Sequence, residues 1–495
     1  MRRSLAALLV LLAPAAARGQ SIDTLALRAH THFLAHDLLR GRDTGSEGEW
    51  LAALYIISEL RRMGIEGAGP GGEYLQHVPL RRARVDHAAS RVVLRTANKE
   101  QTFRSGEHFT PATGGAAAFR DFAGDLLFAG TAEHAAAALA GHTSLNGRVV
   151  TVLGTLGARA GTLVQDWIRR GAAGVLLLLP DSAQFELLVR SRGDVRFFLD
   201  APADDPIWQP PLPVLIAGPE LTRAVLAAAP LDPGALTGAS PFTAVDLGRS
   251  IQASIRVVVD DVDAHNVAAL IPGRDPARRH EVIAFTAHYD HLGIGEPDAN
   301  GDSIYNGFSD NAAGVAMLLA IADALRQDPP ARSVLFLFFT GEERGLLGST
   351  YYVSAPLIPL ERTVAVINLD AGAPPAPPVS WRISGGTRSS LGEEAARIAR
   401  ERGWTAQLED ARPNSDHWPF LRHGVPVAFI IPGREWEGLT ATEQERLFRR
   451  WDRYHQAGDE WVEEFPWAGL RRYAEFGLAL GRRIADAPGR PRLLP

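Results

Sequence analysis

The fold of this chain is indicated most clearly by one apolar segment that ends in polar residues, VIAFTAHYD at residues 282–290. Three later segments have a similar pattern, at residues 334–343, 364–370 and 425–433. Segments with the apolar spacing of helices alternate with them, at about residues 311–325, 389–402 and 470–485. Because buried strands that alternate with helices are typical of α/β proteins, the pattern predicts a mixed, mostly parallel sheet sandwiched by helices.

Histidine and carboxylate side chains follow three of these strands directly. His288 and Asp290 end the first, Glu342 and Glu343 follow the second, and Asp370 follows the third. Ligands of open α/β sheets bind beyond the carboxyl ends of the strands, so we expect these side chains to meet around one site. The side chains at positions 288 and 290 point to the same face of an extended strand. The carboxylate of Asp290 can therefore accept a hydrogen bond from the N–H of a metal-binding imidazole at His288.

Each candidate also has an ordinary structural interpretation. Residues 288–290 could end a surface strand, Asp310 could cap the helix that follows it, and His455 lies in a loop where polar surface residues are common. Glu342 and Glu343 fit a solvated turn, but neighbouring side chains diverge. One of them can therefore bind a metal while the other accepts a proton from a metal-activated water.

Taken together, the candidates form a metal-binding set of two imidazoles and three carboxylates. The chain contains no cysteine, so disulfides and thiolate ligands are excluded. Histidines and carboxylates suit zinc, with cobalt or manganese as substitutes. Two such ions about 3.5–4 Å apart can polarise a carbonyl group and activate water. The pattern therefore favours a metal-dependent hydrolase.

Composition and the first residues exclude other classes and indicate export. The chain has 495 residues and a formal net charge of -6, so no basic excess points to nucleic acid or an anionic membrane. Arg2 and Arg3, the apolar run Leu5–Leu12 and the small residues at 15–19 are typical of a signal peptide in residues 1–20. Because Pro14 interrupts this run, we expect cleavage rather than anchoring, a periplasmic or extracellular location, and no membrane span after cleavage.

A change of amino-acid composition near residue 106 predicts an inserted domain. From there to about residue 250 the chain is rich in Gly and Ala and has its own short apolar strands and helices. The catalytic domain would then combine residues 21–105 with residues 251–495. Since the insert contains no candidate metal cluster or nucleophile, we expect it to shape access to the site.

Four motifs resemble those of the co-catalytic di-zinc peptidase family: HYDHLG at 288–293, NGFSDNAAG at 306–314, GEERGLLGS at 341–349 and NLD at 368–370. The resemblance extends to GRDTGS at 41–46 and to His455. This family contains bacterial aminopeptidases and glutamate carboxypeptidase, with glutaminyl cyclases as relatives, and its fold is zinc exopeptidase-like. The insert resembles a protease-associated domain through its strand order and Leu212-Pro213-Val214.

The resemblance implies two zinc ions per chain. One would be bound by His288, Asp310 and Asp370. The other would be bound by Asp310, Glu343 and His455, so that Asp310 bridges the two ions.

The resemblance also implies roles for residues outside the metal shell. Glu342 would be the general base, and Asp290 would orient His288. Asp416 and His417, in a further family-like motif, are expected near the substrate pocket.

The expected function is an exported aminopeptidase that hydrolyses N-terminal residues of peptide substrates. A carboxypeptidase or dipeptidase would share the metals but anchor the other terminus, with an arginine for a carboxylate in place of an acid for an ammonium. A glutaminyl cyclase would use one zinc, which the full bridging set argues against. A non-catalytic binding protein is the remaining alternative, and the complete set of ligands and base argues against it.

Overall fold

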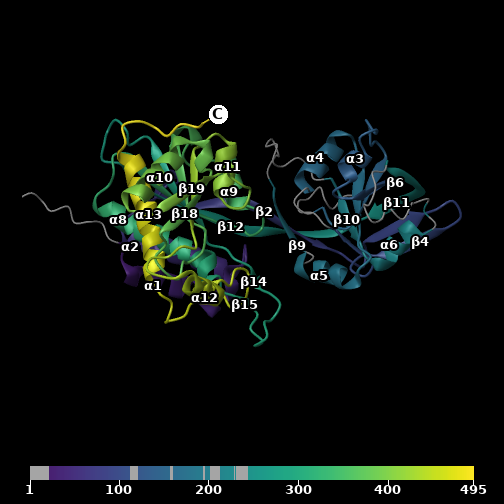
Figure 1. Ribbon diagram of the computed structural model, residues 1–495, viewed down its shortest axis with the longest axis horizontal. Helices are drawn as coiled ribbons and strands as arrows, with labels where there is room; N and C mark the ends of the chain where they lie inside the picture. Colours follow the sequence, from purple (N-terminus) through teal and green to yellow (C-terminus); the bar gives the residue numbers. More distant parts are fainter. Residues whose placement is uncertain are drawn as a thin grey trace, which may run out of the picture. The chain divides into compact units, whose positions relative to one another are not determined.

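The computed structural model describes residues 22–111, 121–156, 160–192, 195–200, 212–227, 229 and 243–494. The signal peptide expected at residues 1–20 lies outside these described residues. The chain divides into two compact units (Figure 1). The first comprises Met1–Gln76 and Asn266–Pro495, and the second comprises His77–His265.

A mixed sheet forms the centre of the first unit, in the order β19-β18-β20-β17-β13-β16-β12. The strand β13 pairs in parallel with β16 and β17, and β17 pairs in parallel with β20, whereas β12 and β18 join their neighbours β16 and β20 antiparallel. This arrangement confirms the predicted α/β class. The strands are β12 (Val257–Ile271, of which Asn266–Ile271 lies in this unit), β13 (Val282–His288), β16 (Ser333–Phe339), β17 (Thr363–Asn368), β18 (Ser380–Ser384), β19 (Thr405–Glu409) and β20 (Val427–Pro432).

Helices cover both faces of this sheet because the central strands are apolar on both faces. In β13, Ile283 and Phe285 pack into the core shared with α1, α2, α8, α10 and α13, whereas Val282 and Ala284 pack into the core shared with α9 and α11. The helices of this unit are α1 (Thr24–Leu34), α2 (Glu47–Arg62), α8 (Ala313–Gln327), α9 (Leu347–Ser354), α10 (Ser390–Glu401), α11 (His417–Arg422), α12 (Ala441–Trp451) and α13 (Ala468–Asp486).

One segment of the first unit is long and apolar enough to cross a membrane, which the sequence analysis did not anticipate. It is Phe308–Gln327, which contains α8. The protein interior buries 89% of its apolar window, and α1, α13 and β13 pack against α8. A helix that is apolar all round is expected where neighbours surround it. The segment therefore has the character of a core helix.

The second unit is built on its own sheet, in the order β4-β3-β11-β6-β7-β8-β10-β5 among the described residues. A parallel run from β6 through β7 and β8 to β10 forms its centre. Its elements are β3 (Arg91–Arg95), β4 (Glu100–Arg104), β5 (Phe109–Pro111), β6 (Phe122–Thr131), α3 (Ala135–Ala138), β7 (Arg148–Leu153), α4 (Ala160–Arg169), β8 (Gly174–Leu178), α5 (Ser182–Arg192), β10 (Val214–Ala217), α6 (Pro219–Leu226) and β11 (Val245–Ser254).

The boundaries of the second unit differ from those expected for the insert. Residues 77–105 and 251–265, which the sequence analysis assigned to the catalytic domain, belong to the second unit. The reason is strand pairing over long sequence distances: β3 pairs with both β4 and β11. Short alternating strands do not reveal their partners in sequence. The resemblance of this unit to a protease-associated domain stays a prediction.

Candidate metal centre

The predicted site residues meet at one edge of the sheet because three parallel strands end there. His288 is the last residue of β13 and lies in register with Phe339, the last residue of β16. Glu342 and Glu343 follow β16 within four residues, and Asp370 follows β17 within two. Parallel pairing therefore gives these side chains a common edge.

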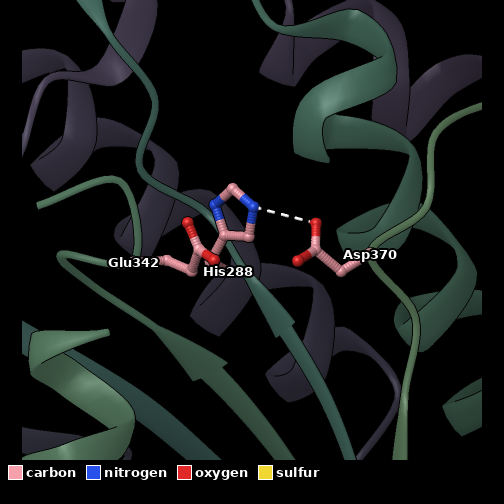
Figure 2. Close-up of side chains that lie close together, drawn as sticks. All are labelled: His288, Glu342 and Asp370. Atoms are coloured by element: carbon pink, nitrogen blue, oxygen red, sulfur yellow. Dashed lines mark hydrogen bonds and ion pairs between the residues drawn. The ribbon is translucent and has the colours of Figure 1, made fainter. Parts of the chain in front are cut away.

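His288 forms one half of the centre together with two carboxylates. Its Nε2 lies 3.0 Å from Oδ1 of Asp370 and 3.1 Å from Oδ1 of Asp310. Figure 2 shows the ring facing Asp370, with Glu342 beside it. One ligand atom each of His288, Glu342 and Asp370 lies within 4.8 Å of the others. The His288 side chain is only 1% exposed.

His455 forms the other half of the centre, from the loop that follows α12. Its Nε2 lies 3.1 Å from Oδ2 of Asp310 and 3.2 Å from Oε2 of Glu343. The two oxygens of Asp310 therefore face two different imidazoles, which is the geometry of a bridging carboxylate. His455 itself adopts a φ of +56°, a left-handed backbone conformation that is unfavourable for a histidine. The loop is thus held in an unusual conformation that directs its imidazole to the centre.

The chemistry of these side chains fits bound cations. The carboxylates of Asp310, Glu343 and Asp370 are nearly buried, and their ion pairs within the described part of the chain are with histidines. Buried carboxylates that face one another are costly unless positive charge lies between them. The Nε2 of His455 is buried without a hydrogen bond despite its short distances to two carboxylates. A cation between these atoms would satisfy both groups, and imidazole with carboxylate is a ligand set for zinc.

Glu342 has the environment of a proton acceptor. Burial raises its pKa well above the usual value, and the carboxylates of Asp370 and Asp416 raise it further. Its side chain reaches the same cavity as His288, Asp310 and Asp370. A carboxyl group with a raised pKa beside the reacting atoms is suited to general acid and base chemistry.

Asp290 differs in part from its expected role. The Nδ1 of His288 lies 3.1 Å from the main-chain oxygen of Asp290, whereas 3.6 Å separates it from the carboxylate. That carboxylate instead accepts hydrogen bonds from the Thr44 hydroxyl (3.0 Å) and from the main-chain N–H of Glu342 (3.1 Å). Asp290 therefore also fixes the turn that carries Glu342.

Two residues that support the ligands were missed by the sequence analysis. The Nδ1 of His291 lies 2.7 Å from Oε1 of Glu343, which leaves Oε2 facing His455. The carboxylate of Asp459 accepts the main-chain N–H groups of Ser309 (3.0 Å) and Asp310 (3.1 Å). Both residues are close to a recognised ligand in sequence, and this closeness was the one signal available for finding them.

A chain of hydrogen bonds also orients Asp370. Thr286 donates to Asn368 at 2.7 Å, Asn368 donates to Ser415 at 2.7 Å, and the Ser415 hydroxyl donates to Oδ2 of Asp370. With Oδ2 held in this way, Oδ1 is left to face His288.

Asp416 and His417, which the sequence predicts near the substrate pocket, do not themselves line the cavity, but the Asp416 carboxylate lies close enough to Glu342 to raise its pKa. Both are fully buried. Burial raises the pKa of Asp416 to about 7 and lowers that of His417 to about 3. Their neighbour Ser415 connects this motif to the centre by a hydrogen bond to Asp370.

A cavity of about 1060 Å³ opens beside His288, Asp310, Glu342 and Asp370. Much of its remaining wall is apolar, as is usual for sites that bind organic ligands. The apolar wall includes Trp381, Phe429, Ile431, Phe448 and Trp451.

The first unit combines an α/β sheet with a histidine–carboxylate centre at the strand ends, which is the ligand set of a zinc site. Residues 266–480 match the family model of Peptidase family M28. The matched residues make up less than half of the chain, and this part of it is similar to that family.

Similar proteins agree with this assignment. A probable leucine aminopeptidase 2 of Aspergillus fumigatus is 27% identical over 200 residues, which are 38% of this chain and 37% of the relative. Aminopeptidase YwaD of Bacillus subtilis is 27% identical over 195 residues, which are 36% of this chain and 39% of the relative. The chain therefore matches well under half the length of these curated relatives.

Two solved structures share the fold over most of the chain. An aminopeptidase from Aneurinibacillus sp. strain AM-1 has a TM-score of 0.55 at 17% identity and covers 96% of this chain and 97% of its own. BSAP, a zinc aminopeptidase from Bacillus subtilis, has a TM-score of 0.51 at 17% identity and covers 96% of this chain and 98% of its own.

Proposed function

We propose that this chain is a zinc-dependent aminopeptidase that binds two zinc ions and removes residues from the N-terminus of peptides. The observation that carries the proposal is the Asp310 carboxylate, whose two oxygens face His288 and His455 at 3.1 Å each. The similarity to proteins named aminopeptidases supports the choice of terminus. Export is part of the proposal and is supported by the composition of residues 1–20.

The proposed reaction follows from the positions of the side chains. Zinc ions bound there would polarise the scissile carbonyl and lower the pKa of a water molecule. Glu342 accepts a proton from this water as the water oxygen bonds to the carbonyl carbon. Glu342 then donates that proton to the amine nitrogen as the peptide bond breaks. Burial raises the pKa of Glu342, which makes its carboxylate a stronger proton acceptor.

Metal removal tests this proposal directly. We expect a strong chelator to abolish release from aminoacyl-nitroanilides and short peptides, and added Zn²⁺ to restore it. An N-acetylated peptide should resist cleavage, whereas the same peptide with an amidated C-terminus should be cleaved. Mass spectrometry of the products and metal analysis of the same sample provide the measurement. No chelator-sensitive release would contradict the proposal, and a content near one zinc per chain with ring closure of N-terminal glutamine would indicate a glutaminyl cyclase.

Arg434 favours a second candidate function, a carboxypeptidase or dipeptidase on the same centre. Its side chain lines the cavity and stacks on Phe448, with its guanidinium carbon 3.6 Å from the ring centroid. Within the described residues Arg434 forms no ion pair, whereas Arg382 in the same cavity lies 3.4 Å from Glu409. A guanidinium without a carboxylate partner is suited to bind the terminal carboxylate of a substrate.

The Arg434→Ala variant separates the two candidates. On the second candidate, we expect KM for peptides with a free C-terminus to rise roughly 10-fold or more, because a charge-assisted hydrogen bond is lost. KM for the matching C-amidated peptides should change little, and kcat should change little for both. Arg412→Ala, an exposed arginine outside the cavity wall, is the matched control. Equal kinetics of the Arg434→Ala variant and the wild type on both peptide forms would exclude a carboxylate anchor at this position.

A further inference from the structure

The proposed function leaves one family-like motif without a role, GRDTGS at residues 41–46. Its arginine, Arg42, is buried, with 1% of its surface exposed. The guanidinium donates hydrogen bonds to main-chain carbonyl groups. Nε donates to Tyr289 O at 2.9 Å, Nη1 to Asn306 O at 2.7 Å, and Nη2 to Gly307 O at 3.1 Å.

The carbonyl groups of Tyr289, Asn306 and Gly307 belong to the two segments that carry the proposed ligands His288 and Asp310, and Nη1 also donates to the carbonyl oxygen of Leu34 at the end of α1. Tyr289 directly follows His288, and Gly307 precedes Asp310 by three residues. The main-chain oxygen of Arg42 also accepts a hydrogen bond of 3.0 Å from the main-chain N–H of His291. A guanidinium is planar and presents its donors in a fixed geometry. The Arg42 side chain therefore fixes the distance between the two segments.

Several features make the position of Arg42 energetically unfavourable. Its charge is buried without a direct carboxylate partner in the described residues, and a buried charge of this kind is costly. Burial lowers the pKa of Arg42 to about 10, so the side chain remains charged at neutral pH, and the acids Asp310 and Asp290 act in the opposite direction. Its φ is +49°, and such left-handed non-glycine residues cluster at functional sites.

Gly41 shows how closely this segment approaches the centre. Its φ is +71°, and a Cβ at this position would lie 2.4 Å from the main-chain oxygen of Gly293. Only glycine permits this approach, which places Arg42 between the two segments.

We infer that Arg42 is a positioning residue that holds His288 and Asp310 at the separation required to share one cation. This inference rests on the proposed metal-dependent function. It predicts that Arg42 determines metal affinity without contacting metal or substrate.

The experiment compares Zn²⁺ binding by the full chain after metal removal. Isothermal titration gives the affinity, and the visible absorption spectrum of the Co²⁺-substituted protein reports ligand geometry. We expect Arg42→Met to weaken binding of the shared cation about 10- to 100-fold, as is typical when the support of a ligand is removed, and to alter the Co²⁺ spectrum. Arg42→Lys keeps the positive charge but lacks the planar guanidinium with its several donors. Its Zn²⁺ affinity should therefore lie between those of Arg42→Met and the wild type.

Arg332→Met is the matched control. Arg332 is equally buried, with 1% of its side chain exposed, and it also donates to main-chain carbonyl groups, including Ile484 O at 2.9 Å and Gly489 O at 3.2 Å. Its hydrogen bonds are all to residues outside the metal centre. The control should lower the unfolding temperature of the metal-free protein but leave the Zn²⁺ affinity of the folded protein unchanged.

The possible outcomes separate this inference from the proposed function. Wild-type affinity in folded Arg42→Met, or an equal loss of affinity in Arg332→Met, would overturn the positioning role and leave the peptidase proposal intact. If Arg42→Met does not fold, Arg42→Lys decides, and a wild-type affinity and Co²⁺ spectrum there would overturn the inference. Absence of Zn²⁺ binding by the wild type would overturn both.

Discussion

The Glu342→Gln variant is expected to bind as much zinc as the wild type while kcat falls by about 10²- to 10⁴-fold, the range that general acid–base catalysis contributes. Glutamine has nearly the same shape as glutamate but cannot accept a proton at neutral pH. In the proposed ligand set, Glu343 and Asp370 bind the metals and Glu342 does not, so the ions should remain. Steady-state kinetics and metal analysis on the same preparation provide the two measurements.

Glu435→Gln is the control for this variant, because Glu435 is another glutamate that lines the same cavity but has no role in the proposed proton transfer. Its kcat should remain close to that of the wild type. If Glu342→Gln retained wild-type turnover, another group would have to move the proton, and the assignment of the base would be wrong.

The Asp310→Ala variant is expected to lose both zinc ions and, with them, measurable turnover. One carboxylate faces His288 with Oδ1 and His455 with Oδ2, so its removal takes a ligand from each proposed ion. Asp370→Ala should instead weaken the binding of chiefly one ion, because His288 is the one histidine ligand that Asp370 faces. Metal content per chain after gel filtration distinguishes the two variants.

Asp323→Ala provides the matched control, since Asp323 lies on α8, the helix that follows Asp310, and pairs with Arg326 at the surface. Its metal content should equal that of the wild type. Comparable zinc content in Asp310→Ala and wild type would refute the bridging role of Asp310.

Much of the catalytic unit could be predicted from the sequence because its signals are local. The segments 282–285 and 334–339 are apolar at every position, and both belong to central strands buried on both faces. Since parallel strands share one carboxyl edge, the acids and the histidine that follow them had to come close together. The five proposed ligands lie together in the structure for this reason, with Asp310 and His455 brought in by the elements next to them.

The remaining features depend on contacts between distant segments, which leave no local pattern. The pairing of β3 with β11 joins residues more than a hundred positions apart and moves the boundary of the second unit. The carboxylate of Asp290 accepts hydrogen bonds from Thr44 and from the turn at Glu342, and it lies 3.6 Å from the imidazole two residues away. Asp416 and His417 have polar side chains in a family-like motif, but the packing of α11 against β20 buries them.

The loop after α12 has a consequence for how this centre can change. His455 offers its imidazole to the metals, and Asp459, four residues later, holds the main-chain N–H groups of Ser309 and Asp310. In the proposed centre, one short stretch of chain would thus provide a ligand and also support the carboxylate that bridges the two ions. In the proposed two-zinc centre, a substitution that shifts this stretch would therefore alter both cation positions together.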